Sequence, residues 1–127
     1  MNVWIVEDDA GYRRNLRMSL ELEGSVEVGM VFPSCVELFE ELESGSSPDV
    51  ILMDLGLPGM SGTEAIRALS AIAPDVDVLV LTVFKEKDRV TEALDAGAAG
   101  YLLKESDSDE ILQGLRAVRE GRVVGIS

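Results

Sequence analysis

Apolar residues follow two rhythms along this chain, and the two rhythms alternate. Short runs rich in valine, isoleucine and leucine predict strands, at residues 3–6, 26–32, 50–53, 76–82 and 98–103. Between these runs, apolar residues recur every three or four positions and predict amphipathic helices, at residues 10–23, 34–43, 61–73, 86–96 and 106–120. Because strand and helix alternate throughout, the pattern favours a parallel sheet with helices on both faces.

Such a series of strand–helix units is typical of the flavodoxin-like α/β fold, a doubly wound sheet in the strand order 2-1-3-4-5. Other signals locate the helix starts: Ser34 with Glu37, and Ser61 with Glu64, have the spacing of capping boxes. In the helix that begins at Ser61, the apolar spacing places Ile72 on the inward face. For a chain of 127 residues we expect one domain, residues 1–127, without an internal linker.

Polar side chains stand where four of the predicted strands end, and they are Glu7, Asp8, Asp54, Thr82 and Lys104. Each has an ordinary structural interpretation by itself, as a helix-capping acid, a turn residue, a strand threonine or a surface lysine. Because the carboxyl ends of strands in a doubly wound sheet meet in one crevice, we expect all five to converge there. Clustered carboxylates repel one another and need a cation. Acids, a cation, a hydroxyl and a lysine together predict phosphoryl transfer to a carboxylate, and Asp54 is our candidate acceptor.

The amino-acid composition limits which cation the protein could bind and which classes of partner it could have. The sequence has no histidine, so a metal would be held by oxygen ligands, which favours Mg²⁺. With 24 acidic and 11 basic residues the net charge is -13, which argues against non-specific binding to nucleic acid or anionic lipid. No apolar run reaches the roughly 18 residues of a membrane span, so we expect no membrane partner. The single cysteine, Cys35, has the spacing of a core helix residue and favours a reducing, cytoplasmic location.

Four motifs carry a resemblance that covers essentially the whole chain. They are VWIVEDD at residues 3–9, VILMDLGLPGMSG at 50–62, VLT at 80–82 and GYLLK at 100–104. In this order and spacing they resemble the CheY-like receiver domain of two-component response regulators. The stretch GAAGYLLKE at residues 97–105 is most similar to the NarL/FixJ (LuxR-type) transcriptional regulators.

The resemblance implies a phosphoacceptor and its metal site. Asp54 would accept a phosphoryl group from a histidine kinase. Asp8 and Asp54 would bind Mg²⁺ through their side chains, Gly56 through its backbone carbonyl and Glu7 through a water molecule.

The resemblance also implies a switch. Lys104 would pair with the phosphoryl group, Thr82 would hydrogen-bond one of its oxygens, and Tyr101 would be the aromatic residue that changes rotamer with it. The protein would then be a switch with intrinsic self-phosphorylation and self-dephosphorylation activity, and not an enzyme acting on a separate substrate.

Partners follow from the same resemblance. We expect a histidine kinase as phosphodonor and a homodimer on phosphorylation, through helices 1 and 5 or through helices 4 and 5. A regulator of this type continues into a helix-turn-helix domain, which residues 1–127 do not contain. DNA binding and transcription regulation would therefore belong to an output domain in a full-length protein, and the chain itself would be either a fragment of that protein or a stand-alone receiver.

Two residues near the predicted entrance bear on the lifetime of the phosphoryl group. We hypothesise that Phe84, close after Thr82, shields the acyl phosphate from water. Gly56 offers no side chain to orient an attacking water, which also predicts slow hydrolysis.

Three other functions compete with this interpretation. A phosphatase with an aspartate nucleophile would need a second aspartate two residues after Asp54, where this chain has Gly56. A flavodoxin-like cofactor binder would need glycines and amides after the first strand, where this chain has acids. A phosphorylation-independent interaction module is disfavoured by the complete set of polar residues at the strand ends.

Overall fold

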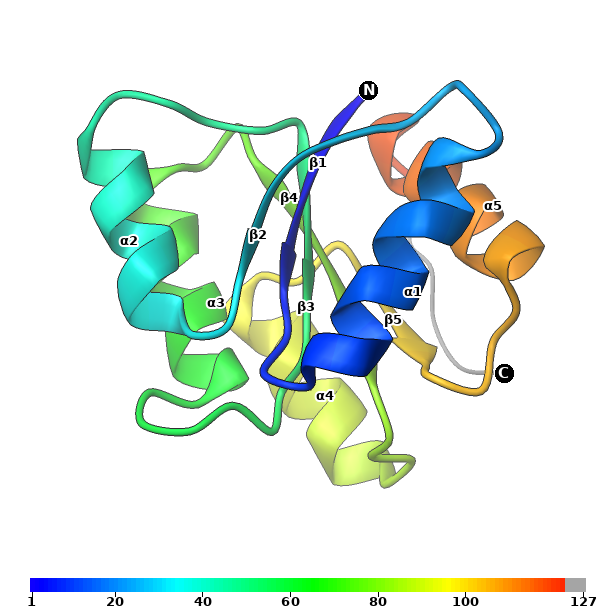
Figure 1. The fold of residues 1–127 in the computed structure, drawn as a ribbon. Coiled ribbons are helices and arrows are strands. Elements are labelled where there is room, and N and C mark those ends of the chain that lie inside the picture. The colour runs from blue at the N-terminus through cyan, green and yellow to red at the C-terminus, as the bar shows by residue number, and fades with distance from the viewer. Residues whose placement is uncertain (123–127) are drawn as a thin grey trace.

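The computed structural model of this chain describes residues 1–122, in which a parallel sheet of five strands lies between two helical layers (Figure 1). The strands are β1 (Asn2–Val6), β2 (Glu27–Phe32), β3 (Val50–Met53), β4 (Asp77–Thr82) and β5 (Gly100–Leu103). The helices are α1 (Ala10–Glu21), α2 (Cys35–Glu43), α3 (Gly62–Ile72), α4 (Lys87–Ala96) and α5 (Ser108–Arg119). Residues 123–127 of the predicted domain lie outside the described part.

The strand order is β2-β1-β3-β4-β5, so the predicted flavodoxin-like topology is confirmed. All pairs of neighbouring strands are parallel, and β1 pairs with β3 from Val3–Val50 to Val6–Met53. The chain order reverses between these two strands, which makes their carboxyl ends the switch point of the sheet. The Asp54 N–H donates to the Val6 carbonyl at 3.2 Å, so the residues that follow β1 and β3 start side by side.

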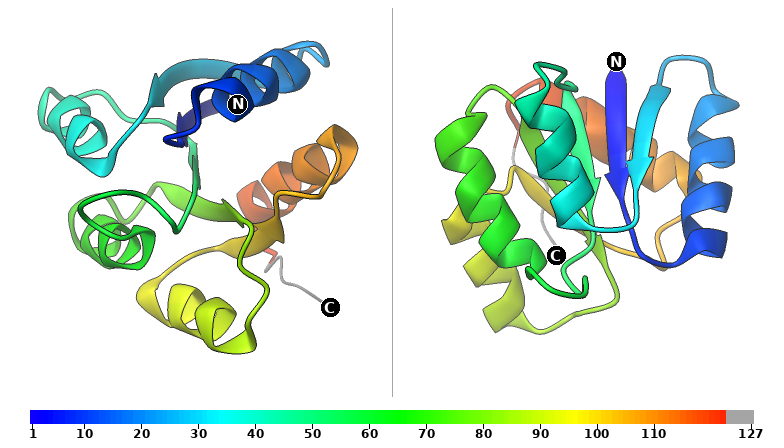
Figure 2. Two further views of the ribbon diagram at one scale, coloured as in Figure 1. Left: turned by 60° about the horizontal axis from the view of Figure 1, so that its bottom comes forward. Right: turned by 60° about the vertical axis from the view of Figure 1, so that its left-hand side comes forward.

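Each face of the sheet has its own apolar core. Figure 2 shows α1 and α5 on one face, and α2, α3 and α4 on the other. Alternate residues of β3 serve the two cores, with Val50 and Leu52 facing α1 and α5, and Ile51 and Met53 facing the other layer. All four are buried, which explains why β3 reads as a continuous apolar run. A polar side chain directly after such a strand is therefore held at the rim of a rigid sheet.

Two details of the predicted helices are wrong. Ser34 precedes α2 without a side-chain capping bond, so it forms no capping box with Glu37, whereas the Ser61–Glu64 capping box is present. Ile72 is 62% exposed, although the spacing Ile66, Leu69, Ile72 predicted an inward face. Each three-residue step falls short of a full helical turn by about 60°, so the second step carries Ile72 off the buried face.

The bounds of the helices and strands agree with the ranges predicted from the sequence to within two residues. None of the helices in residues 1–122 is both long and apolar enough to cross a membrane.

Candidate functional site

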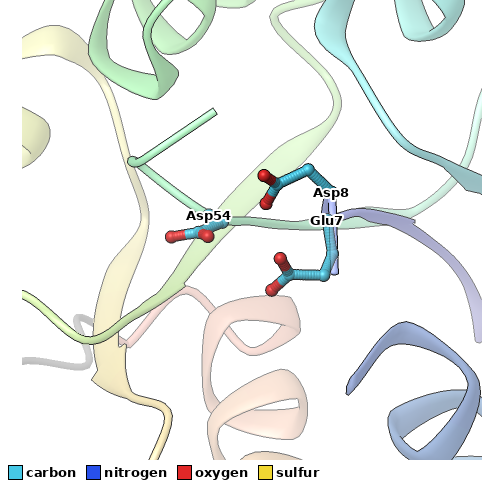
Figure 3. Close-up of side chains that lie close together, drawn as sticks. All are labelled: Glu7, Asp8 and Asp54. Carbon is cyan, nitrogen blue, oxygen red and sulfur yellow. The ribbon is translucent and has the colours of Figure 1, made fainter. Parts of the chain in front are cut away.

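Three carboxylates meet where β1 and β3 end. One oxygen from each of Glu7, Asp8 and Asp54 lies within 4.8 Å of the others, and Figure 3 shows the side chains directed into one space. Glu7 and Asp54 are buried, with exposed fractions of 2% and 7%, whereas Asp8 is exposed. The cluster is therefore enclosed on the sheet side and open to solvent beside Asp8.

Lys104 joins two of these acids. It follows β5, its N–H donates to the Thr82 carbonyl at 2.8 Å, and its Nζ donates to Asp54 Oδ2 at 3.1 Å. The same ammonium forms a salt bridge with Glu7 and lies 4.6 Å from the centroid of the Tyr12 ring. One cation thus faces two buried carboxylates, and its aromatic neighbour shields it from solvent.

Burial and ion pairing have opposite effects on the pKa of Glu7 and on the pKa of Lys104. Burial is the largest influence on Glu7 and raises the pKa of its carboxyl, against the lowering effect of its hydrogen bond to Lys104. For Lys104, burial disfavours the charged form, but hydrogen bonds to Glu7 and Asp54 and their negative charges outweigh it and raise the pKa. The ammonium of Lys104 therefore stays charged beside Glu7 and Asp54.

A second group of residues surrounds the end of β4. Thr82 is fully buried there, and its hydroxyl accepts a long hydrogen bond, 3.5 Å, from the Phe84 N–H. Tyr101 of β5 is also fully buried, and its hydroxyl donates to the Phe84 carbonyl at 2.8 Å. Burial raises the pKa of Tyr101, so this donor keeps its proton. The aromatic ring predicted to change rotamer is here in an inward position.

The loop after Asp54 lies close to the loop after Thr82. The Gly56 N–H donates to Asp54 Oδ1 at 3.3 Å, which helps to fix the carboxylate. A Cβ atom at Gly56 would lie 3.3 Å from the Phe84 ring, so the ring rests against this glycine. The predicted placement of Phe84 at the entrance of the site agrees with this contact.

The site residues named from the sequence are thus connected to one another near the carboxyl edge of the sheet, through the acid cluster, Lys104 and the two loops. Sequence reasoning missed three neighbours of these residues. Tyr12 covers Lys104, Arg13 Nη1 donates to the Glu7 carbonyl at 2.6 Å, and the Arg89 guanidinium lies 4.0 Å from the centroid of the Phe84 ring. Tyr12 has the spacing of a packing residue on α1, together with Leu16 and Leu20. The contacts of Arg13 and Arg89 have no signal in the sequence pattern, because they depend on the geometry of the loops.

Comparisons with known proteins agree with this arrangement. Residues 3–116 match the family profile of the response regulator receiver domain. The transcriptional regulatory protein DegU of Brevibacillus brevis is 38% identical over 124 residues, which are 95% of this chain and 51% of that protein. The nitrate/nitrite response regulator protein NarP of Escherichia coli is 38% identical over 125 residues, which are 96% of this chain and 56% of that protein. The chain spans about half the length of these curated relatives.

Solved structures agree as well. The receiver domain of the putative response regulator NarL from Mycobacterium tuberculosis has a TM-score of 0.88 and 31% identity, covering 95% of this chain and 97% of that one. The isolated receiver domain of RcsB from Salmonella enterica, solved in the presence of the phosphomimetic BeF3-, has a TM-score of 0.89 and 25% identity, covering 100% of this chain and 94% of that one. This chain therefore belongs to the receiver domain family of two-component response regulators.

Proposed function

We propose that Asp54 is the residue of this receiver domain that accepts the phosphoryl group. One observation carries the proposal: the buried Asp54 carboxylate is hydrogen-bonded to Lys104 and lies beside the carboxylates of Glu7 and Asp8. No other aspartate in the described residues 1–122 has a lysine and two acids around it. A carboxylate in such a setting is a nucleophile that has both a counter-charge and room for a metal.

The acid cluster fits Mg²⁺. Its donors are carboxylate oxygens, and the open side at Asp8 admits the water molecules that Mg²⁺ retains when it binds to proteins. We propose that Asp8 and Asp54 bind the ion directly and that the Gly56 carbonyl completes the protein ligands. Because Glu7 is already paired with Lys104, it suits a role through water better than a direct one. The ion would neutralise charge on the transferring phosphoryl group.

The residues of the chain perform the rest of the transfer. An Asp54 carboxylate oxygen attacks the phosphorus, and the bond to the donor breaks as the new oxygen–phosphorus bond forms. Lys104 starts within hydrogen-bond distance of that carboxylate, so its ammonium can follow the charge onto a phosphoryl oxygen. The buried Thr82 hydroxyl would donate to another oxygen, and the hydrogen bond that it now accepts from Phe84 would weaken. Tyr101 would respond because its hydroxyl is bonded to the same loop.

Acetyl phosphate tests the acceptor without a kinase, because a small donor relies on the domain's own chemistry. With acetyl phosphate and Mg²⁺ we expect the intact mass to rise by one phosphoryl group, and Asp54→Asn to abolish the rise. The exposed Asp75→Asn serves as the matched control and should label like the wild type. Labelling that survives in Asp54→Asn would show that another residue is the acceptor.

For a longer protein that contains this domain, we propose a histidine kinase as phosphodonor, a homodimer on phosphorylation and control of transcription through an output domain, in the cytoplasm. The names of the relatives support this, since DegU is a transcriptional regulatory protein and a related structure holds two RcsB dimers on DNA. Light scattering with BeF3- and Mg²⁺ tests dimer formation. A molecular mass that stays monomeric at high protein concentration would contradict it.

A further inference from the structure

The ring of Phe84 lies between two groups that come from different loops and helices. On one side it rests against Gly56, where a Cβ atom would be 3.3 Å from the ring edge. On the other side the Arg89 guanidinium lies 4.0 Å from the ring centroid, a cation–π distance. Arg89 is in the first turn of α4, so this contact connects α4 to the loop beside Asp54.

The backbone of Phe84 is held independently of its ring. Its N–H donates to the Thr82 hydroxyl at 3.5 Å, and its carbonyl accepts the Tyr101 hydroxyl at 2.8 Å. With the backbone fixed at both groups, the freedom that remains is rotation of the side chain. Phe84 also packs against the apolar core on the face of the sheet that carries α2, α3 and α4, so the contact with Arg89 adds to this packing in holding the ring over Gly56.

Arg89 has competing partners that it does not use. Glu86, Asp88 and Glu92 line the same groove of about 660 Å³ beside α4, yet none of them forms an ion pair with Arg89 within the described residues. Arg89 is exposed and has acids nearby, yet its guanidinium lies on the face of the Phe84 ring. This position indicates a specific contact with the ring and not merely a solvated surface charge.

We propose that Arg89 is a positioning residue that latches the Phe84 ring across the entrance of the phosphoacceptor site and thereby lengthens the life of the phosphoryl group. The inference rests on the proposed function of Asp54. In the step that it slows, a water oxygen attacks the phosphorus and the bond to the Asp54 carboxylate breaks. The carboxylate is regenerated, and inorganic phosphate leaves as H2PO4⁻ with both hydrogens of the water.

The decay of the phosphorylated protein, measured by intact mass after the donor is removed, tests the latch. We expect Arg89→Met to decay about two- to fivefold faster than the wild type, the size that a partly exposed cation–π contact gives to the closed position. Arg89→Lys should recover part of the loss because it keeps a cation. Lys87→Met, an equal charge change on the same helix, should decay like the wild type.

A double variant separates the latch from a general effect of α4. Phe84→Ala should decay at least as fast as Arg89→Met, and Arg89→Met should add nothing in the Phe84→Ala background. Wild-type decay in Arg89→Met, or full additivity of the two changes, would overturn the proposal. Equal urea midpoints of Arg89→Met and Lys87→Met would exclude loss of stability as the cause.

The ring position can also be read without phosphorylation, so failure of the latch and failure of the acceptor assignment are distinguishable. The Gly56 amide lies beside the ring and should shift in the ¹H–¹⁵N spectrum of Phe84→Ala through loss of the ring current. Arg89→Met should move the same peak in the same direction by a smaller amount. A Gly56 peak that stays at its wild-type position in Arg89→Met refutes the latch, whether or not Asp54 accepts a phosphoryl group.

Discussion

Replacing Lys104 by methionine tests how the charges of the site are balanced. Methionine keeps much of the apolar length of the lysine side chain but removes the ammonium that faces Glu7 and Asp54. Two buried carboxylates would then lie beside each other and beside Asp8 without a protein cation. We therefore expect the metal-free protein to lose stability and to depend on a divalent cation more strongly than the wild type.

The expected loss of stability can be estimated from the burial of the three side chains in these ion pairs. The side chains of Lys104, Glu7 and Asp54 are 17%, 3% and 9% exposed, so the ion pairs are largely removed from water. Removing one partner of a fully buried pair costs about 3–5 kcal/mol. Because the cluster opens to solvent beside Asp8, we expect about 2–3 kcal/mol, which lowers the melting temperature of a chain of this length by about 10 °C.

Mg²⁺ should recover part of this loss. Lysine and the metal compete for the same carboxylates, so the variant should bind Mg²⁺ about tenfold more tightly, which adds about 1.4 kcal/mol of stabilisation at saturation. Thermal unfolding with EDTA and with Mg²⁺ measures both effects. Lys85→Met is the matched control, because Lys85 pairs with Glu105 at 3.7 Å where both side chains are about two-thirds exposed.

Two results would refute the reasoning. One is a Lys104→Met variant that melts within about 2 °C of the wild type in EDTA, because the ammonium would then contribute no more than a surface charge. The other is an equal gain of melting temperature with Mg²⁺ in both proteins, because lysine and metal would then not share ligands.

Three further predictions concern the surroundings of the site. Gly62→Ala should cost about 1–3 kcal/mol in urea unfolding, because its Cβ would lie 2.6 Å from the Asp54 carbonyl oxygen, whereas Gly56→Ala meets a movable ring edge and should cost less. Burial raises the pKa of the Cys35 thiol to about 11, so Ellman's reagent should react with it only after unfolding. The buried neutral thiol contributes stability that is fully present below its ordinary pKa of 9.0 and is lost as the pH rises through 11. Tyr101→Phe should lower stability by about 1 kcal/mol through loss of its hydrogen bond, and an unchanged urea midpoint would contradict this.

The sequence predicted the fold well because both faces of the sheet are covered. A strand buried on two sides, such as β3, must be apolar throughout, and amphipathic helices must separate such strands. The same logic located the candidate site. Asp54 interrupts the apolar pattern where β3 ends, and topology brings Glu7 and Lys104 to the same edge.

Contacts between side chains of different loops could not be predicted from the sequence. The capping box expected at Ser34 failed because spacing cannot show whether a serine rotamer faces the helix. The stacking of Arg89 on Phe84 depends on the path of the loop between β4 and α4, which no periodic pattern encodes. Geometry of this kind requires coordinates, whereas the meeting of strand ends requires only the strand order.

Glu7 pairs with Lys104 and also belongs to the acid cluster that we propose to bind Mg²⁺, so it has a second role besides that of an acid near the metal. Its carboxylate holds Lys104 beside Asp54, and it is also one of the three acids that fit Mg²⁺. If Asp54 is the acceptor, as we propose, Lys104 can move toward the charge of the phosphoryl group while Glu7 keeps the lysine side chain near the site. A Glu7→Gln change would keep the shape and lose the charge that holds the lysine. It should therefore slow phosphorylation even at saturating Mg²⁺, whereas a residue that acts through the metal alone would be rescued by added Mg²⁺.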